Sequence, residues 1–149
     1  MTSSQVRWCS GSTSSECSAR SSSATASSED SRDRYINQTL ARFDEVVARH
    51  PGETSFGDRL VLTELVQGMF IYQSAGQGNR RHYHETENEF WVVLKGTLKW
   101  EFDDGETVIA RAGDVVLAKA GRWHKITVVG DEPTVRFAVV KPDVLHIFE

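Results

Sequence analysis

The sequence predicts an all-β fold, a sandwich or jelly roll, preceded by one helix. From residue 56 onward, short segments rich in alternating apolar residues follow one another, and turn residues separate them. No segment with helical spacing interrupts these strands, as one would in an α/β protein. A chain of 149 residues has room for one hydrophobic core. We therefore expect a single β domain over residues 56–149.

Residues 1–31 are expected to form a disordered tail. Serine dominates this segment, and no periodic apolar pattern occurs in it, so it cannot bury enough surface to offset the entropy of ordering. Both cysteines, Cys9 and Cys17, lie here, so the predicted domain has neither a disulfide nor a cysteine-rich zinc site. A serine-rich leader can be an organellar transit peptide, but the acidic residues Glu16 and Glu29 are atypical of one. We expect a cytoplasmic protein.

Residues 32–51 predict one amphipathic helix. Ser31 or Asp33 can cap its start, and His50-Pro51-Gly52 ends it. Its apolar positions fall near helical spacing: Tyr35, Ile36, Leu40, Phe43, Val46 and Val47. We expect this helix to pack on the outside of the β domain or at a subunit contact.

The β domain is expected to consist of short strands joined by tight turns. Asp103-Asp104-Gly105 predicts a hairpin turn, and Asp131-Glu132-Pro133 separates the last two long strands. A hinge near Gly68 separates the first two strands. The predicted strands cover residues 59–66, 69–74, 81–84, 89–94, 97–102, 107–110, 115–118, 124–129, 134–140 and, more briefly, 145–148.

The candidate site lies in the stretch from Gly76 to Gly96. His82 and His84 are two residues apart, so both imidazoles point to the same face of a strand. Glu89 has an odd offset from His84, but the polar residues 85–88 predict a turn that lets Glu89 face the histidines. Two imidazoles and one carboxylate are the ligands of the facial triad that binds first-row metals.

This stretch resembles the first motif of the cupin superfamily, which reads G, five residues, H-x-H, three or four residues, E, six residues, G. Its fixed positions are filled by Gly76, His82, His84, Glu89 and Gly96. The second cupin motif reads G, five residues, P-x-G, two residues, H, three residues, N. Its glycines and histidine are matched by Gly113, Gly121 and His124, whereas Lys119 and Val128 replace the usual proline and asparagine. The resemblance covers roughly residues 60–141.

The resemblance implies a cupin jelly-roll β-barrel, also called a double-stranded β-helix. It also implies a metal centre with one divalent ion per chain. The ligands would be His82, His84, Glu89 and His124. Fe is the first expectation for the metal, and Mn, Ni, Co and Zn are the alternatives, because the ligand set alone does not choose among them.

Strand alternation extends the candidate site to a pocket. If the ligands point inward, so do Arg80, Trp91, Ile126 and Val128, while Trp100 lies on the apolar face of the next strand. We expect these five residues to line a mostly apolar substrate site, with Arg80 binding a substrate carboxylate. No titratable group besides Glu89 is clearly placed inside. His50 and His146 are assigned no role.

We expect a metal-dependent enzyme that acts on a small organic molecule, first of all a non-heme Fe(II) dioxygenase. A lyase, isomerase or decarboxylase that uses Mn, Ni or Zn as a Lewis acid is one alternative, and a non-catalytic small-molecule binder is another.

The net charge of −4 gives no basic surface of the kind that binds nucleic acid. No apolar run approaches the roughly 18 residues that span a bilayer. A homodimer is expected, because open sheets leave edges to cover.

Overall fold

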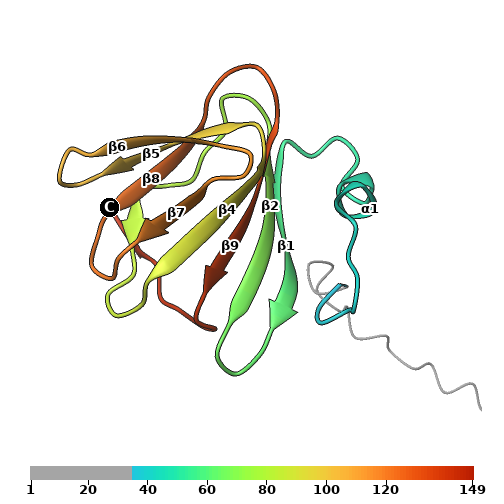
Figure 1. The fold of residues 1–149 in the computed structure, drawn as a ribbon, viewed down its shortest axis with the longest axis horizontal. Coiled ribbons are helices and arrows are strands. Elements are labelled where there is room, and N and C mark those ends of the chain that lie inside the picture. Colours follow the sequence, from blue (N-terminus) through green and yellow to red (C-terminus); the bar gives the residue numbers. More distant parts are fainter. Residues whose placement is uncertain (1–34) are drawn as a thin grey trace, which may run out of the picture.

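The computed structural model describes residues 35–149 and consists of two antiparallel five-stranded sheets (Figure 1). The first sheet has the order β1-β2-β9-β4-β7, and the second has the order β10-β3-β8-β5-β6. This arrangement confirms the predicted all-β jelly roll. The predicted disordered tail, residues 1–31, lies outside the described residues. The elements are α1 (Phe43–Ala48), β1 (Ser55–Leu62), β2 (Gln67–Gln73), β3 (His82–Tyr83), β4 (Glu89–Lys95), β5 (Thr97–Phe102), β6 (Thr107–Arg111), β7 (Val115–Ala118), β8 (His124–Val128), β9 (Thr134–Val140) and β10 (Ile147–Phe148).

Strands β5, β7 and β9 have the predicted bounds, whereas the first connection differs. The chain turns at residues 63–66, where the Thr63 hydroxyl accepts the Val66 amide at 3.0 Å and the Val66 carbonyl accepts the Thr63 amide at 2.9 Å. The predicted hinge at Gly68 is wrong, because Gly68 lies inside β2, where a side chain would collide with the Phe137 ring. The local bonds of Thr63 end β1 earlier than its apolar residues suggest.

The main core lies between the two sheets. Its largest side chains are the indoles of Trp91 in β4 and Trp100 in β5, whose ring centroids are 5.7 Å apart. The other buried members come from β4 to β9: Val93, Leu98, Phe102, Ala110, Val116, Ala118, Ile126, Val128 and Ala138. Burying two indoles and these aliphatic side chains supplies the main driving force for closing one sheet over the other.

The helix is shorter than the predicted range 32–51, because α1 spans only Phe43–Ala48 among the described residues. The side chain of Asn37 bonds to both backbone groups of Leu62, at 2.7 and 2.9 Å, and the φ of Asn37 is 55°. These bonds hold the chain before Phe43 against β1 in a non-helical conformation. Tertiary hydrogen bonds thus override the helical spacing.

Helix α1 packs on the outer face of the first sheet, beside β1 and β2 (Figure 1). Val46 is fully buried there, in a second apolar cluster with Phe56, Phe70 and Val135. None of the described helices is long and apolar enough to cross a membrane. The outer cluster therefore attaches α1 to the outer face of the first sheet.

His50, to which the sequence assigned no role, connects the end of α1 to β1. Its ring stacks on Phe56 with centroids 3.8 Å apart, and its Nε2 lies 3.0 and 3.1 Å from the two carboxylate oxygens of the buried Asp58. Its Nδ1 lies 2.9 Å from the Glu53 carboxylate. Burial disfavours the charged ring, but the hydrogen bonds to Glu53 and Asp58 outweigh burial and raise the pKa of His50.

This raised pKa predicts a pH-dependent stability. Protonated His50 contributes stability that is fully present below the unfolded pKa of about 6.5 and is lost as the pH rises through the higher folded pKa. His50→Gln should therefore lower the free energy of unfolding by about 1 kcal/mol more at pH 6 than at pH 9. Urea denaturation of both proteins at the two pH values measures this difference, and an equal loss at both would contradict it.

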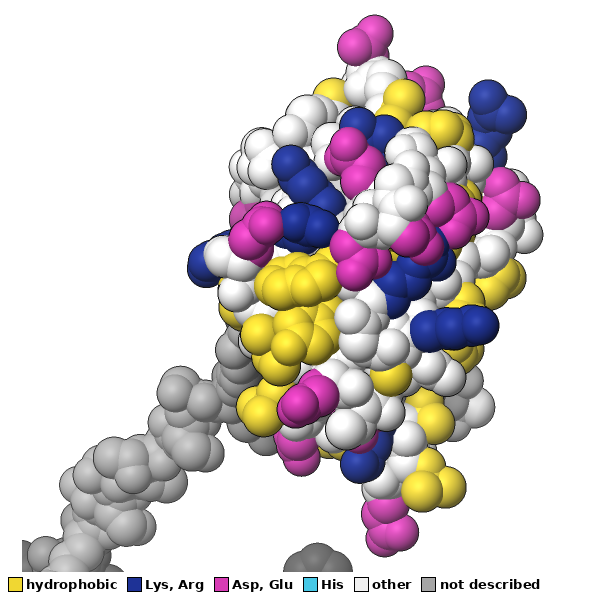
Figure 2. Space-filling model, turned by 90° about the vertical axis from the view of Figure 1, so that its left-hand side faces the viewer, with side chains coloured by type: hydrophobic (Ala, Val, Ile, Leu, Met, Phe, Trp, Pro, Cys, Tyr) yellow, Lys and Arg dark blue, Asp and Glu magenta, His cyan; other side chains and the backbone are white. Residues whose placement is uncertain are grey.

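Charged side chains of both signs are interspersed on the face shown in Figure 2, and no described histidine reaches this face. Arg122 pairs with Asp104 at 2.6 Å and Glu106 at 2.5 Å, and its guanidinium lies over the Phe102 ring at 3.7 Å. Such exposed pairs contribute little to stability. Apart from His50, the described histidines lie close to one another: His82, His84 and His124 are buried inside the barrel, and the His146 ring lies beside those of His82 and His84.

Candidate metal centre

The structure brings His82, His84, Glu89 and His124 together. Their potential ligand atoms all lie within 4.8 Å of one another, and all four side chains are buried. His82 in β3 is paired with His124 in β8, His84 directly follows β3, and Glu89 begins β4 in the opposite sheet. Residues 85–88 carry the chain from one sheet to the other, as the predicted strand–turn–strand arrangement requires. One carboxylate therefore faces three imidazoles across the barrel.

Glu89 is the one candidate ligand that comes from the first sheet, and it contacts the histidines of the second sheet. Its Oε2 lies 2.8 Å from His84 Nε2 and 3.7 Å from His124 Nε2. The rings of His82 and His124 are 4.3 Å apart. The Nε2 atoms of His84 and His124 thus face the Glu89 carboxylate.

Backbone carbonyls orient all three imidazoles. The Nδ1 atoms of His82, His84 and His124 lie 2.8, 3.0 and 3.2 Å from the carbonyl oxygens of Arg80, Leu145 and Arg122, respectively. A carbonyl only accepts hydrogen bonds, so each Nδ1 carries the proton and donates it. The Nε2 atoms of His82 and His124 then keep a lone pair for a metal, which is the usual way in which outer partners fix a metal-binding histidine. The Nε2 of His84 instead donates to Glu89 Oε2 at 2.8 Å and would release this proton when a metal binds.

The donor set fits a divalent first-row ion. His124 Nε2 is buried and has no hydrogen-bond partner among the described residues, which is costly unless a cation accepts its lone pair. Burial lowers the pKa of His124 to about 4 and also lowers the pKa of His82, so both rings are neutral at pH 7. Burial opposes protonation of His84, but its bond to Glu89 raises its pKa. Nitrogen and carboxylate ligands suit Fe, Mn, Ni, Co and Zn alike.

A cavity of about 240 Å³ opens beside the cluster. Trp91 and Ile126 line it, as predicted, and Trp91 also contacts the His124 ring, with centroids 5.1 Å apart. The full lining is Ile71, Asn79, Arg80, His82, Glu89, Trp91, Ile126, Arg136, His146 and Phe148. Trp100 and Val128 do not line this cavity, which corrects the sequence expectation. Strand alternation correctly predicts that the side chains of Trp100 and Val128 point inward. They lie in the core between the sheets, where the Trp100 ring packs against the Trp91 ring.

Arg80 lies at the rim of the cavity rather than in its interior. Its side chain is exposed, donates to the Glu149 carbonyl at 2.5 Å and lies over the Phe148 ring at 5.0 Å. Strand β3 contains only residues 82 and 83, so the inward alternation inferred from His82 does not extend back to Arg80. Its predicted contact with a substrate carboxylate stays a prediction.

The sequence reasoning missed five residues of the cavity, and Arg136 and His146 are the two titratable ones among them. Arg136 could have been found, because it is the one charged residue of the apolar strand β9 and shares its inner face with Thr134 and Ala138. His146 lies in the C-terminal segment, outside both motifs, with its ring 4.9 Å from His82 and 4.6 Å from His84. Only tertiary structure brings it there. The expectation that Glu89 is the sole titratable group inside is therefore wrong.

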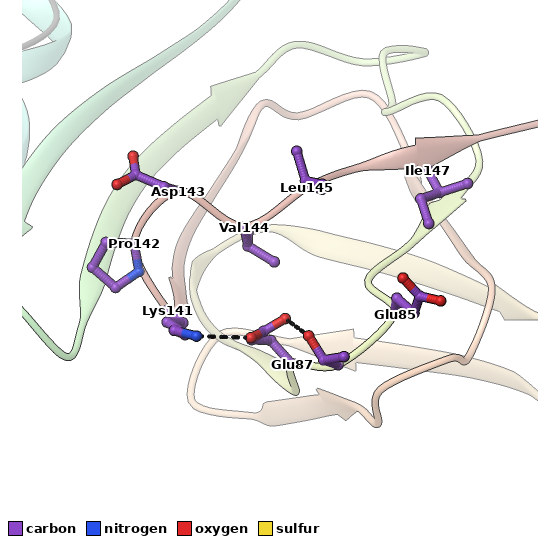
Figure 3. Close-up of a pocket in the computed structure, with 9 residues that line it drawn as sticks. Glu85, Glu87, Lys141, Pro142, Asp143, Val144, Leu145 and Ile147 are labelled. Atoms are coloured by element: carbon purple, nitrogen blue, oxygen red, sulfur yellow. Dashed lines mark hydrogen bonds and ion pairs between the residues drawn. The ribbon is translucent and has the colours of Figure 1, made fainter.

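A second cavity, of about 200 Å³, lies between the loop after β3 and the C-terminal segment (Figure 3). Lys141 Nζ pairs with Glu87 at 3.1 Å, and the Thr86 hydroxyl also donates to Glu87. None of the four candidate ligands lines this cavity. This cavity is connected to the candidate metal centre through the C-terminal segment. Leu145 lines the cavity, and its backbone carbonyl orients the His84 ring.

Comparison with known proteins agrees with this geometry. A sequence family described as "Cupin domain" matches residues 68–141, a range that holds all four candidate ligands. The uncharacterized protein YdbB of Bacillus subtilis is 36% identical over 44 residues, which are 30% of this chain and 39% of that protein. This chain thus matches about two fifths of the length of that curated relative.

Solved structures share the fold. A Klebsiella pneumoniae protein with a double-stranded β-helix domain superimposes with a TM-score of 0.63 at 23% identity, over 75% of this chain and 99% of that one. KdgF from Halomonas sp. gives a TM-score of 0.55 at 16% identity, over 62% and 83%. Oxalate decarboxylase from Lactobacillus farciminis gives 0.57 at 20%, over 66% and 32%. At these identities the likeness concerns the fold alone.

Proposed function

The chain belongs to the cupin superfamily, and on this premise we propose that it is a metal-dependent enzyme acting on a small organic molecule. One observation carries the proposal. Three carbonyl-oriented imidazoles and one carboxylate converge within 4.8 Å, and His82 and Glu89 among them line a cavity. A structural site would be closed by its protein ligands, whereas this one borders space that a small molecule can occupy.

A divalent ion at this site would supply a Lewis acid or, as Fe(II), a centre for O2 activation. The residues around the ion would hold it in place and shape the substrate site. Glu89 would provide a negative charge to the ion, and the backbone carbonyls that hold each Nδ1 would keep the three Nε2 atoms directed at it. Trp91 and Ile126 wall the cavity with apolar surface and so limit the access of bulk water to a bound substrate.

We propose dioxygenase-type chemistry with Fe(II) as the first reaction to test. Purified protein would be loaded anaerobically with Fe(II), Mn(II), Ni(II) or Zn(II), and oxygen uptake would be recorded with a panel of small carboxylic acids and thiols. The expected result is uptake by the Fe(II) form alone, matched by consumption of one compound. His84→Ala protein, treated in the same way, is the control without metal. An Fe(II) form that binds compounds but consumes no oxygen with any of them would contradict this chemistry.

Arg136 and His146 favour a second candidate, Lewis-acid chemistry without oxygen. They add a guanidinium and an imidazole to the cavity, and such groups can hold a polar substrate while a metal polarises it. In that case the Mn(II), Ni(II) or Zn(II) form would eliminate, isomerise or decarboxylate a compound anaerobically. If every metal form binds compounds and none is turned over, the protein is a small-molecule binder.

A homodimer is also proposed. Strand β7 is one of the two edge strands of the first sheet, and the apolar side chains of Phe90, Val115 and Leu117 are exposed on or beside it. Open edges and apolar patches of this kind are usually covered. Sedimentation velocity at about 10 μM should show a dimer for the wild type and a monomer for Leu117→Glu. A wild-type monomer at this concentration would argue against the proposal.

A further inference from the structure

Arg136 is a charged side chain held inside the barrel. It lies on the inner face of β9 and is 3% exposed. Its Nη1 donates to Gln73 Oε1 at 2.7 Å, and Gln73 in turn donates to the Gly78 carbonyl at 3.0 Å. Its Nε is buried and has no hydrogen-bond partner in the described part of the chain. The guanidinium is therefore positioned by one neutral amide and keeps an unused donor.

No carboxylate of the described residues forms an ion pair with Arg136, and Glu89 attracts it only from a longer distance. Burial lowers the pKa of Arg136 to about 10, so it is still protonated at neutral pH. A buried cation without an adjacent anion is costly to the fold. If Glu89 binds a metal cation, its negative charge is offset by the metal and stabilises the positive charge of Arg136 even less. The chain itself thus supplies no anionic partner for this guanidinium.

The cavity offers the place for such a partner. Arg136 lines the same cavity of about 240 Å³ as the candidate ligands His82 and Glu89, so one small molecule can contact both the guanidinium and the metal centre. Arg80 at the rim is different, because it is exposed and already donates to the Glu149 carbonyl.

The walls and the size of the cavity define the ligand. Most of its remaining lining is apolar, from Ile71, Trp91, Ile126 and Phe148, which suits a short carbon skeleton. A cavity of this volume lies below the usual range for drug-sized ligands. A planar guanidinium fork matches a carboxylate through two parallel hydrogen bonds, whereas a doubly charged phosphate would need more donors than one arginine provides.

We propose that Arg136 binds the carboxylate of a small carboxylic acid beside the metal centre, and that such acids are the substrate class of this protein. This inference rests on the proposed metal-dependent function. The carboxylate compensates the buried guanidinium, and the rest of the acid is held between Trp91 and Ile126, next to His82 and Glu89. Arg136 would therefore be the residue that selects acids over their uncharged analogues.

Isothermal titration calorimetry of the Mn(II)-loaded protein tests the inference. The probes are pyruvate and malonate, with pyruvamide and malonamide as uncharged controls and inorganic phosphate as the alternative anion. At least one acid should bind, its amide and phosphate should bind far more weakly, and Arg136→Met should weaken acid binding by about 10- to 100-fold. Arg136→Lys keeps the buried charge and should give an intermediate loss. Arg111→Met removes an exposed arginine of β6 that does not line the cavity, and it should change acid binding by less than about 3-fold.

Metal content and folding are measured on the same samples, which separates the failure modes. If the acids bind Arg136→Met as tightly as the wild type, or if no acid binds the metal-loaded wild type, the inference is wrong. If Arg136→Met and Arg136→Lys lose metal together with acid binding, Arg136 supports Glu89 instead of holding substrate. A further outcome is that the protein takes up no metal, while acids still raise the melting temperature of the wild type but not of Arg136→Met. In that case the metal-dependent function is wrong, and the carboxylate site at Arg136 is supported.

Discussion

Replacing His124 with alanine is expected to abolish metal binding while the barrel stays folded. His124 Nε2 is buried, has no other hydrogen-bond partner among the described residues and faces Glu89 across 3.7 Å. Removing a metal ligand should weaken metal affinity by more than about 100-fold, because loss of an outer partner alone costs 10- to 100-fold. Metal per chain, measured after equilibrium dialysis, reports the loss.

His50→Gln is the matched control for this variant. It also removes a partly buried imidazole, but His50 bonds to Glu53 and Asp58 on the outer face of the first sheet. It should therefore keep the full metal content. Wild-type metal content in His124→Ala would show that His124 is not a ligand, and loss in both variants would point to a general folding defect.

Deleting residues 142–149 is the second change with a large expected effect. The Leu145 carbonyl holds His84 Nδ1 at 3.0 Å, and β10 pairs with β3, which carries His82. Without this segment the His84 ring is free to rotate, and metal affinity should fall by about 10- to 100-fold. The barrel should still fold, because its core comes from strands β4 to β9. Competition with a chromophoric chelator measures the affinity.

Glu149→Ala separates this effect from simple loss of charge at the terminus. It removes the exposed pair between Arg81 and Glu149, which contributes little, but keeps the Leu145 carbonyl in place. We expect nearly wild-type metal affinity for Glu149→Ala. A truncated protein that also retains wild-type affinity would mean that the C-terminal segment does not position His84.

The sequence predicts the ligand cluster well because the determinants are local. Strand alternation places His82 and His84 on one face, and the turn at residues 85–88 returns Glu89 to the same point, as the structure shows. His124 pairs with His82 across β3 and β8, a long-range contact that the resemblance to the second cupin motif implied. Spacing and motif are therefore sufficient to predict that these four side chains come together.

Other features depend on contacts that spacing does not encode. Asn37 bonds to Leu62 across the chain and prevents the long helix that apolar periodicity predicts. Alternation tells which face Trp100 and Val128 occupy but not how deep in the barrel they lie. His146 reaches the mouth only because β10 pairs with β3. Arg136, by contrast, is predictable from the sequence, since a charged residue in the middle of an apolar strand indicates a buried charge.

If His82, His84, Glu89 and His124 bind one divalent metal, anomalous X-ray diffraction from crystals of the Mn(II)-loaded protein will locate it. We expect a single strong peak within about 2.0–2.4 Å of the three Nε2 atoms and one carboxylate oxygen of Glu89. The absence of a peak among these four side chains, or a peak bound by other residues, would contradict this assignment.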